Sequence, residues 1–215
     1  MEKKCFSYTE TDSLPYIVTV PSGLSADERL PLIVFLHGAG ERGNNPEILR
    51  VHSVPKLFTD DPDYHGLRVI TLSPQCPPDD VWSAHVHTLH ALIEQTISEY
   101  PIDPDRVTIT GISMGGFGTW EMICRYSGMF AAAAPICGGG MVWRAGALKN
   151  LPIRAFHGDC DSTVLPEYSL EMVRAVNAAG GHAELTLYPG VGHDSWNNAY
   201  SQSDVLEWLA AQKRR

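Results

Sequence analysis

The segment Gly111-Ile-Ser-Met-Gly115 constrains the fold more than any other part of the chain. Apolar, β-branched residues precede it from Val107 onward, and small, helix-compatible residues follow it as far as Trp120. This order predicts a strand, a sharp turn and a helix, with Ser113 at the tip of the turn. The flanking glycines are expected because a Cβ at either position would collide with the neighbouring strand and helix. The pattern predicts a nucleophilic serine; a serine that only caps a helix is the alternative.

Two later loops carry the acid and the base that such a serine requires. Asp161 follows a strand-like run that begins at Ile153, and His193 lies in a glycine-rich loop after the strand-like Ala183–Tyr188. The chain order is therefore nucleophile, acid and base, and each residue follows a predicted strand. We expect Ser113, Asp161 and His193 to meet at one edge of a sheet as a catalytic triad.

Strand-like and helical segments alternate along the 215 residues without internal repeats. This alternation predicts an α/β fold with a mostly parallel central sheet of about eight strands and helices on both faces. The expected strands are Cys5–Tyr8, Tyr16–Val20, Leu32–Leu36, Leu67–Leu72, a run from Val107, Phe130–Ile136, Leu151–His157 and Ala183–Tyr188. The expected helical segments are part of Ile48–Phe58, His85 to about Tyr100, the segment after Ser113, Pro166–Ala179 and Tyr200–Ala211. The expected turns are those around Thr11–Leu14 and over Pro101–Arg106.

The length of the chain predicts a single domain over residues 1–215. The segment between Ile136 and Ile153 is too short for a large cap domain. We therefore expect the pocket beside the serine to be open and shallow.

A glycine-rich loop that begins at His37 follows the predicted strand Leu32–Leu36. In this position we expect one half of an oxyanion hole, formed by the backbone N–H of Ala39 or Gly40; the N–H of Met114 would supply the other half. His37 is expected to shape this loop through hydrogen bonds to the backbone rather than to take part in the chemistry.

Four side chains from loops at the same sheet edge are candidates for binding substrate: Gln75, Trp82, Trp143 and Trp196. Trp82 could instead pin its loop to the body of the protein, and Trp143 could belong to the core. The histidines of the segment His85–His90 are expected on a solvated helix surface, because no cysteine or carboxylate accompanies them at ligand spacing. No metal site is predicted.

The net charge of −9 and the lack of a basic run other than the terminal Lys213-Arg-Arg215 argue against nucleic acid as a partner. No apolar run is long enough to cross a membrane. The beginning of the chain lacks the apolar core of a signal peptide, which predicts a cytoplasmic protein; secretion of a longer precursor is the alternative. The five scattered cysteines favour reduced thiols over a disulfide framework.

Several segments together resemble one group of enzymes, the compact, lidless α/β-hydrolases of the carboxylesterase/phospholipase and polyhydroxybutyrate-depolymerase-like group. They are Leu36-His-Gly-Ala-Gly-Glu-Arg-Gly43, Ser73-Pro-Gln-Cys-Pro77, Gly111-Ile-Ser-Met-Gly-Gly-Phe-Gly-Thr-Trp120, His157-Gly-Asp-Cys-Asp161 and Gly192-His193. Feruloyl and acetyl-xylan esterases are relatives of this group. Its acid falls in a His-Gly-x-x-Asp-x-x-Val pattern, which selects Asp161 over Asp159.

The resemblance implies a serine carboxylesterase that hydrolyses short-chain or aromatic acyl esters through an acyl-enzyme and needs no cofactor. Its substrate would be a small-molecule or oligosaccharide ester. A feruloyl or acetyl-xylan esterase acting on plant polysaccharide is one alternative. A small serine peptidase is another, disfavoured because peptidases of this fold normally add a domain that orients the substrate. A binding protein that has lost catalysis is a third, disfavoured because no member of the triad is missing.

Overall fold

The computed structural model describes residues 1–8 and 13–214, and a single mixed sheet runs through this part of the chain. The sheet has eight strands in the order β1-β2-β4-β3-β5-β6-β7-β8. Their bounds are β1 (Glu2–Ser7), β2 (Ser13–Thr19), β3 (Leu30–Leu36), β4 (Ile70–Pro74), β5 (Ile102–Ile112), β6 (Ala132–Ile136), β7 (Ile153–Gly158) and β8 (Ala183–Tyr188). The pairs β1–β2 and β2–β4 are antiparallel, and the other five pairs are parallel. The predicted α/β fold with a mostly parallel sheet is confirmed.

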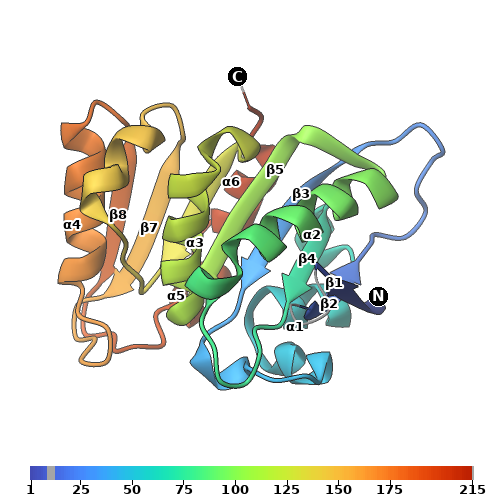
Figure 1. The fold of residues 1–215 in the computed structure, drawn as a ribbon, viewed down its shortest axis with the longest axis horizontal. Coiled ribbons are helices and arrows are strands. Elements are labelled where there is room, and N and C mark those ends of the chain that lie inside the picture. Colours follow the sequence, from blue (N-terminus) through green and yellow to red (C-terminus); the bar gives the residue numbers. More distant parts are fainter. Residues whose placement is uncertain (9–12, 215) are drawn as a thin grey trace.

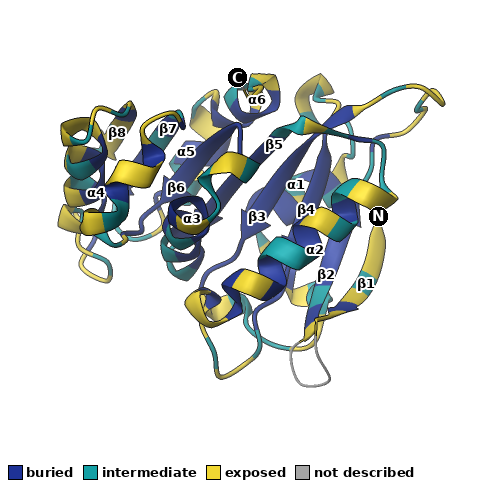
Figure 2. Cartoon of the chain, turned by 45° about the horizontal axis from the view of Figure 1, so that its top comes forward, coloured by how far each residue is buried: buried dark blue, intermediate teal, exposed yellow. Residues whose placement is uncertain are grey.

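Helices cover both faces of the sheet (Figure 1). Their bounds are α1 (Ser53–Asp60), α2 (Val86–Glu99), α3 (Met114–Arg125), α4 (Glu167–Ala178), α5 (Trp196–Gln202) and α6 (Val205–Ala211). The buried side chains of α2, α3 and α4 pack into one apolar cluster with the sheet, and those of α1, α5 and α6 pack into a second cluster. Figure 2 shows the strands buried between helices whose outer surfaces are exposed. None of the helices in the described residues is long and apolar enough to cross a membrane.

The side chains of the central strand β3 pack against the helices on both faces of the sheet. All seven of its residues are buried, as the continuous apolar run predicts for a parallel strand that is covered on both faces. Successive side chains of a strand point to opposite faces. Accordingly, Leu32, Val34 and Leu36 belong to the cluster with α2, α3 and α4. Ile33 and Phe35 belong to the cluster on the other side.

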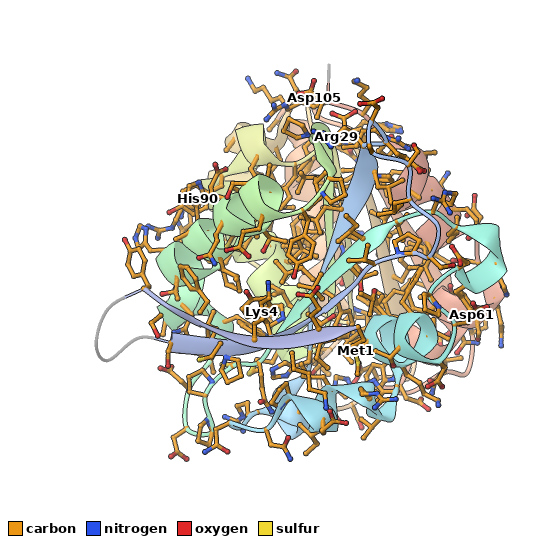
Figure 3. The ribbon with its side chains drawn as sticks, turned by 90° about the vertical axis from the view of Figure 1, so that its right-hand side faces the viewer. Met1, Lys4, Arg29, Asp61, His90 and Asp105 are labelled. Atoms are coloured by element: carbon orange, nitrogen blue, oxygen red, sulfur yellow. The ribbon has the colours of Figure 1, made fainter. Side chains whose placement is uncertain are left out.

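The edge strand β1 closes one side of the sheet and faces the viewer in Figure 3. Phe6 is its only buried residue. Lys4 lies on this outer strand, and its ammonium is 3.4 Å from Glu99 at the end of α2. A charged side chain on an exposed edge discourages pairing with another chain.

Two segments differ from the sequence-based expectation. The predicted turn over Pro101–Arg106 is wrong, because β5 already begins at Ile102, which pairs with Leu30 before a bulge in the ladder. The predicted helix Tyr200–Ala211 is divided into α5 and α6, because Ser203 adopts an extended backbone. Its hydroxyl donates to the carbonyl of Ala199 and accepts from the N–H of Val205, which caps both helix ends.

The remaining bounds shift by a few residues. The expected partly helical segment Ile48–Phe58 consists of a 3-10 turn, Pro46–Val51, followed by α1. The turn expected around Thr11–Leu14 falls partly outside the described residues, and Ser13 and Leu14 belong to β2.

Candidate active site

Ser113 occupies the sharp turn between β5 and α3. Its backbone is left-handed, with φ of 53° and ψ of −117°, a conformation that costs a non-glycine residue about 1–3 kcal/mol. The N–H of Ser113 donates to the carbonyl of Ile136 at 3.0 Å and lies 3.3 Å from the sulfur of Cys137. These contacts tie the turn to the end of β6 and hold the hydroxyl above the edge of the sheet.

The glycines on either side of Ser113 allow α3 to begin directly against the sheet. A Cβ at Gly115 would overlap the carbonyl oxygen of Leu36 at the end of β3. A Cβ at Gly111 would overlap the carbonyl of Gly115 itself. The expected steric reason for both glycines is present in the structure.

Three side chains from the carboxyl ends of β5, β7 and β8 form a chain of hydrogen bonds. The hydroxyl of Ser113 lies 2.9 Å from Nε2 of His193, and Nδ1 of His193 lies 2.7 Å from Oδ2 of Asp161. Burial alone would raise the pKa of Asp161, but hydrogen bonds from His193 and from the N–H groups of Val164 and Thr163 outweigh it and lower this pKa. An ionised Asp161 places the proton of His193 on Nδ1, which leaves Nε2 free to accept the proton of the serine.

A second imidazole, that of His157, contacts the same acid. Its Nε2 lies 3.2 Å from Oδ2 of Asp161 and 2.9 Å from the carbonyl of Val164. Its Nδ1 lies 2.8 Å from the hydroxyl of Ser169, which in turn contacts the carbonyl of Gly138 at 2.8 Å. His157 and its partners Asp161, Ser169 and Gly138 are buried, and Val164 is half-buried. His157 was recognised from the sequence only as part of a motif, although its position four residues before the acid could have identified it as a neighbour of Asp161.

The buried thiol of Cys137 lies next to the backbone of Ser113. Cys137 follows β6, and burial raises the pKa of its thiol to about 12, which keeps it protonated. Its sulfur and ligand atoms of Asp161 and His193 lie within 4.8 Å of one another. Among the described residues this is the one set of three histidine, cysteine or acidic side chains close enough to share an ion, and it coincides with the hydrogen-bonded chain.

The expected oxyanion donors lie on both sides of Ser113. Met114 is the first residue of α3, so its N–H has no acceptor within the helix. Ala39 and Gly40 belong to the 3-10 turn Ala39–Glu41, which follows β3, and both are exposed. A Cβ at the preceding Gly38 would be 3.7 Å from the Cβ of Ser113, so this turn runs beside the serine.

Two histidines near the site differ in their surroundings. The buried ring of His37 accepts a hydrogen bond from the N–H of Cys76 at 2.9 Å, as expected for a residue that shapes its loop. Burial lowers the pKa of His37 to about 4. The expectation of a solvated surface is wrong for His85, which is buried with its Nε2 3.1 Å from a carboxylate oxygen of Asp80.

A cavity of about 650 Å³ opens beside the hydroxyl of Ser113. Aromatic and apolar side chains from α3, α4 and three connecting segments line most of it. Its lining includes Val81, Trp82, Met114, Phe117, Met141, Val164 and Tyr168. A larger hollow of about 870 Å³ lies at the amino ends of β6, β7 and β8, on the opposite edge of the sheet from the serine.

Of the four predicted substrate-binding side chains, only that of Trp82 lines the cavity. Trp82 lines the cavity and also pins its loop, because its indole N–H donates to the carbonyl of His37 at 3.0 Å. Gln75 does not line it: this residue is buried, and its amide donates to the carbonyl of Glu41. Trp143 does not line it either, because its 3-10 turn directs the side chain outward and leaves 78% of it exposed.

Trp196 has a different position from the other three. Its ring packs edge-on against the ring of His193, with 5.4 Å between centroids, and stacks on His52. It therefore supports the imidazole from outside the cavity. Sequence reasoning missed Phe117 and Tyr168 as lining residues. Phe117 could have been found, since it lies one helical turn after the serine on the same predicted helix.

Comparisons with known proteins give a consistent result. The model of the phospholipase/carboxylesterase family matches residues 68–210. A probable carboxylesterase of Oryza sativa subsp. japonica is 26% identical over 229 residues, which cover 93% of this chain and 85% of the rice protein. Poly(3-hydroxyalkanoate) depolymerase C of Paucimonas lemoignei is 30% identical over 137 residues, which cover 61% of this chain and 33% of the depolymerase.

Solved structures resemble the whole chain. A thermostable esterase superposes with a TM-score of 0.90 and 34% identity, over 99% of this chain and 63% of that protein. A ferulic acid esterase superposes with a TM-score of 0.75 over 97% of this chain and 98% of that one; at 18% identity this likeness concerns the fold alone. The chain thus spans less than two thirds of the thermostable esterase and about a third of the depolymerase.

Proposed function

Because this chain belongs to the phospholipase/carboxylesterase family of hydrolases, we propose that it is a serine carboxylesterase that acts on short-chain or aromatic acyl esters. The observation that carries the proposal is the hydrogen-bonded chain from Ser113 through His193 to Asp161, which ends at the mouth of a largely apolar cavity. The three residues are the proposed triad.

In the first half of the proposed reaction, the oxygen of Ser113 attacks the ester carbonyl while Nε2 of His193 takes the serine proton. The negative charge that develops on the carbonyl oxygen is stabilised by the N–H of Met114 and by that of Ala39 or Gly40. His193 then gives its proton to the departing alcohol, and the acyl group remains on Ser113. Asp161 holds the ring and stabilises its positive charge during this step.

In the second half, a water molecule gives a proton to His193 and attacks the acyl-enzyme. The tetrahedral intermediate collapses, the oxygen of Ser113 recovers the proton from His193, and the carboxylic acid leaves. Both halves use the same base and the same oxyanion donors. The chemistry requires only groups that this chain contains.

The lining of the cavity favours an apolar or aromatic acyl group. Phe117 and Tyr168 meet edge-on with 5.8 Å between their centroids, and Trp82 lies on the far side. Aromatic rings in such a site contact flat acyl groups over a large area. A short acyl group would fill only the part beside Ser113.

A polysaccharide ester is the second candidate substrate, and the exposed Trp143 favours it. This indole follows the cavity residue Met141 by two positions and offers a flat apolar surface to solvent. A sugar ring could stack there while its acyl substituent enters the cavity. A relative with matching function in its name is the bifunctional acetylxylan esterase/xylanase of Neocallimastix patriciarum, 27% identical over 153 residues.

The proposal is tested with Ser113→Ala, assayed on 4-nitrophenyl acetate and on a fluorophosphonate probe that modifies activated serines. We expect hydrolysis to fall at least about a thousandfold and labelling to disappear. Ser98→Ala, on the exposed side of α2, is the matched control and retains both. Unchanged turnover by Ser113→Ala would remove this serine from the mechanism. A wild-type protein that the probe does not label would favour an inactive binding protein.

A further inference from the structure

One face of α3 forms the floor of the cavity beside Ser113. Its lining residues on this helix are Met114, Phe117, Gly118 and Glu121, which have the spacing of a single helical stripe. Since Ser113 immediately precedes the helix, the floor begins at the nucleophile and continues along the helix axis. The far end of the floor is Glu121.

The walls close tightly against this floor. A Cβ at Gly118 would be 2.7 Å from the Cβ of Trp82, so the indole lies directly on the helix. On the other side, Tyr168 packs against Phe117, and a Cβ at Gly139 would be 2.7 Å from the Cβ of Tyr168. The cavity is therefore a trough that runs along α3, and we call it the acyl trough.

Glu121 is an acidic side chain at the end of an otherwise apolar trough. Only 14% of the side chain is exposed. Its Oε1 lies 3.4 Å from the guanidinium of Arg125 and 3.5 Å from that of Arg144. Both contacts fall on Oε1, so they leave Oε2 as the carboxylate oxygen that can accept a hydrogen bond from a ligand.

The helix sets the length of ligand that would reach this oxygen. Glu121 lies eight positions after Ser113, and at 1.5 Å per residue this separation is about 12 Å along the helix axis. With the serine oxygen and the carboxylate taken to be as far apart as their backbone positions, the bond to the serine oxygen and one hydrogen bond at the far end leave about 8 Å for the acyl group. An extended 4-hydroxycinnamoyl group has about this length.

We propose that Glu121 is a specificity-determining residue that selects acyl groups with a hydroxyl at the end remote from the ester. The hydroxyl donates to the carboxylate in a hydrogen bond strengthened by charge. An acyl group that ends in a carboxylate is rejected, because two negative charges would meet at the end of the trough. This inference rests on the proposed esterase function, since it names the acyl group that the same serine would carry.

The test compares three methyl esters of the same shape: 4-hydroxycinnamate, unsubstituted cinnamate and 4-carboxycinnamate. Wild type is expected to prefer the hydroxylated ester to the unsubstituted one by about tenfold in kcat/KM. Glu121→Gln should reduce this preference to about twofold. The same variant should raise the rate on 4-carboxycinnamate relative to cinnamate about tenfold, because Arg125 and Arg144 lose their partner. A loss of folding cannot produce changes in opposite directions.

The matched control is Glu94→Gln, which removes the same charge from the exposed surface of α2 and leaves all three ratios as in wild type. The inference is overturned if wild type hydrolyses 4-nitrophenyl acetate but does not prefer the hydroxylated ester, or does not accept cinnamates. It is also overturned if Glu121→Gln changes all three rates equally. If wild type hydrolyses neither the acetate nor any cinnamate, the proposed esterase function itself fails.

Discussion

The buried ring of His157 contacts the carboxylate of Asp161, with 3.2 Å between Nε2 and Oδ2. The other neighbour of this nitrogen is the carbonyl of Val164, which can only accept a hydrogen bond. Nε2 of His157 therefore carries a proton, which it donates to Val164 while its ring edge lies against Asp161; the carboxylate itself accepts from His193 and from the backbone N–H groups of Thr163 and Val164. His157 is a positioning residue for the acid.

Replacement of His157 should alter the chemistry more than the binding of substrate. We expect His157→Phe to lower kcat about tenfold to a hundredfold with little change in KM, because Asp161 loses the polar N–H group that lies against its carboxylate and the loop at Val164 loses a hydrogen bond. The remaining charge on Asp161 then acts more strongly on His193, and we expect the acid limb of the kcat/KM profile to move to higher pH. His157→Gln retains a donor and should recover part of kcat. An unaltered pH profile in both variants would reduce His157 to a packing role.

The close contact between Gly115 and the backbone of β3 predicts that adding a single methyl group at position 115 destabilises the protein strongly. Gly115→Ala places a Cβ on the carbonyl of Leu36, and we expect it to lower the free energy of unfolding by about 3 kcal/mol or more. Gly146→Ala is the control, because a Cβ there has no neighbour within 4 Å. It should be neutral or stabilise by up to about 1 kcal/mol. Urea unfolding midpoints measure both, and equal midpoints would contradict the predicted overlap.

Burial of His37 predicts that the protein loses stability in mild acid. The pKa of this ring is lowered to about 4, whereas in the unfolded chain it is near its ordinary value of about 6.5. Between these values the unfolded state binds the extra proton, so stability falls as the pH decreases from 7 to 4. The loss due to His37 amounts to about 3 kcal/mol.

Urea titrations at pH 7 and pH 4 measure this dependence. His37→Gln, which can still accept from the N–H of Cys76, should reduce the difference in unfolding free energy between the two pH values. His182→Gln, at an exposed position, should leave the difference as in wild type. A difference that does not respond to His37→Gln would assign the acid sensitivity to other groups.

Local sequence patterns predicted those strands and turns whose conformation follows from the residues within them. The continuous apolar run of β3 predicted a strand with helices on both faces of the sheet. The glycines around Ser113 predicted a sharp turn between a strand and a helix. The walls of the acyl trough could not be predicted this way, since Tyr168 reaches it only through the packing of α4 beside a distant loop. The outward direction of Trp143 could not be predicted for the same reason, since the orientation of its 3-10 turn depends on the residues beneath it.

The helix that directly follows Ser113 also provides the floor of the trough, so the nucleophile and the surface that binds the acyl group keep a fixed separation. Each turn of a helix advances about 5.4 Å. Substitutions at positions 117 and 121, which are about one turn apart, would therefore change the accepted chain length at two depths of the trough. A family of variants graded by acyl length is accessible from this one segment, without redesign of any loop.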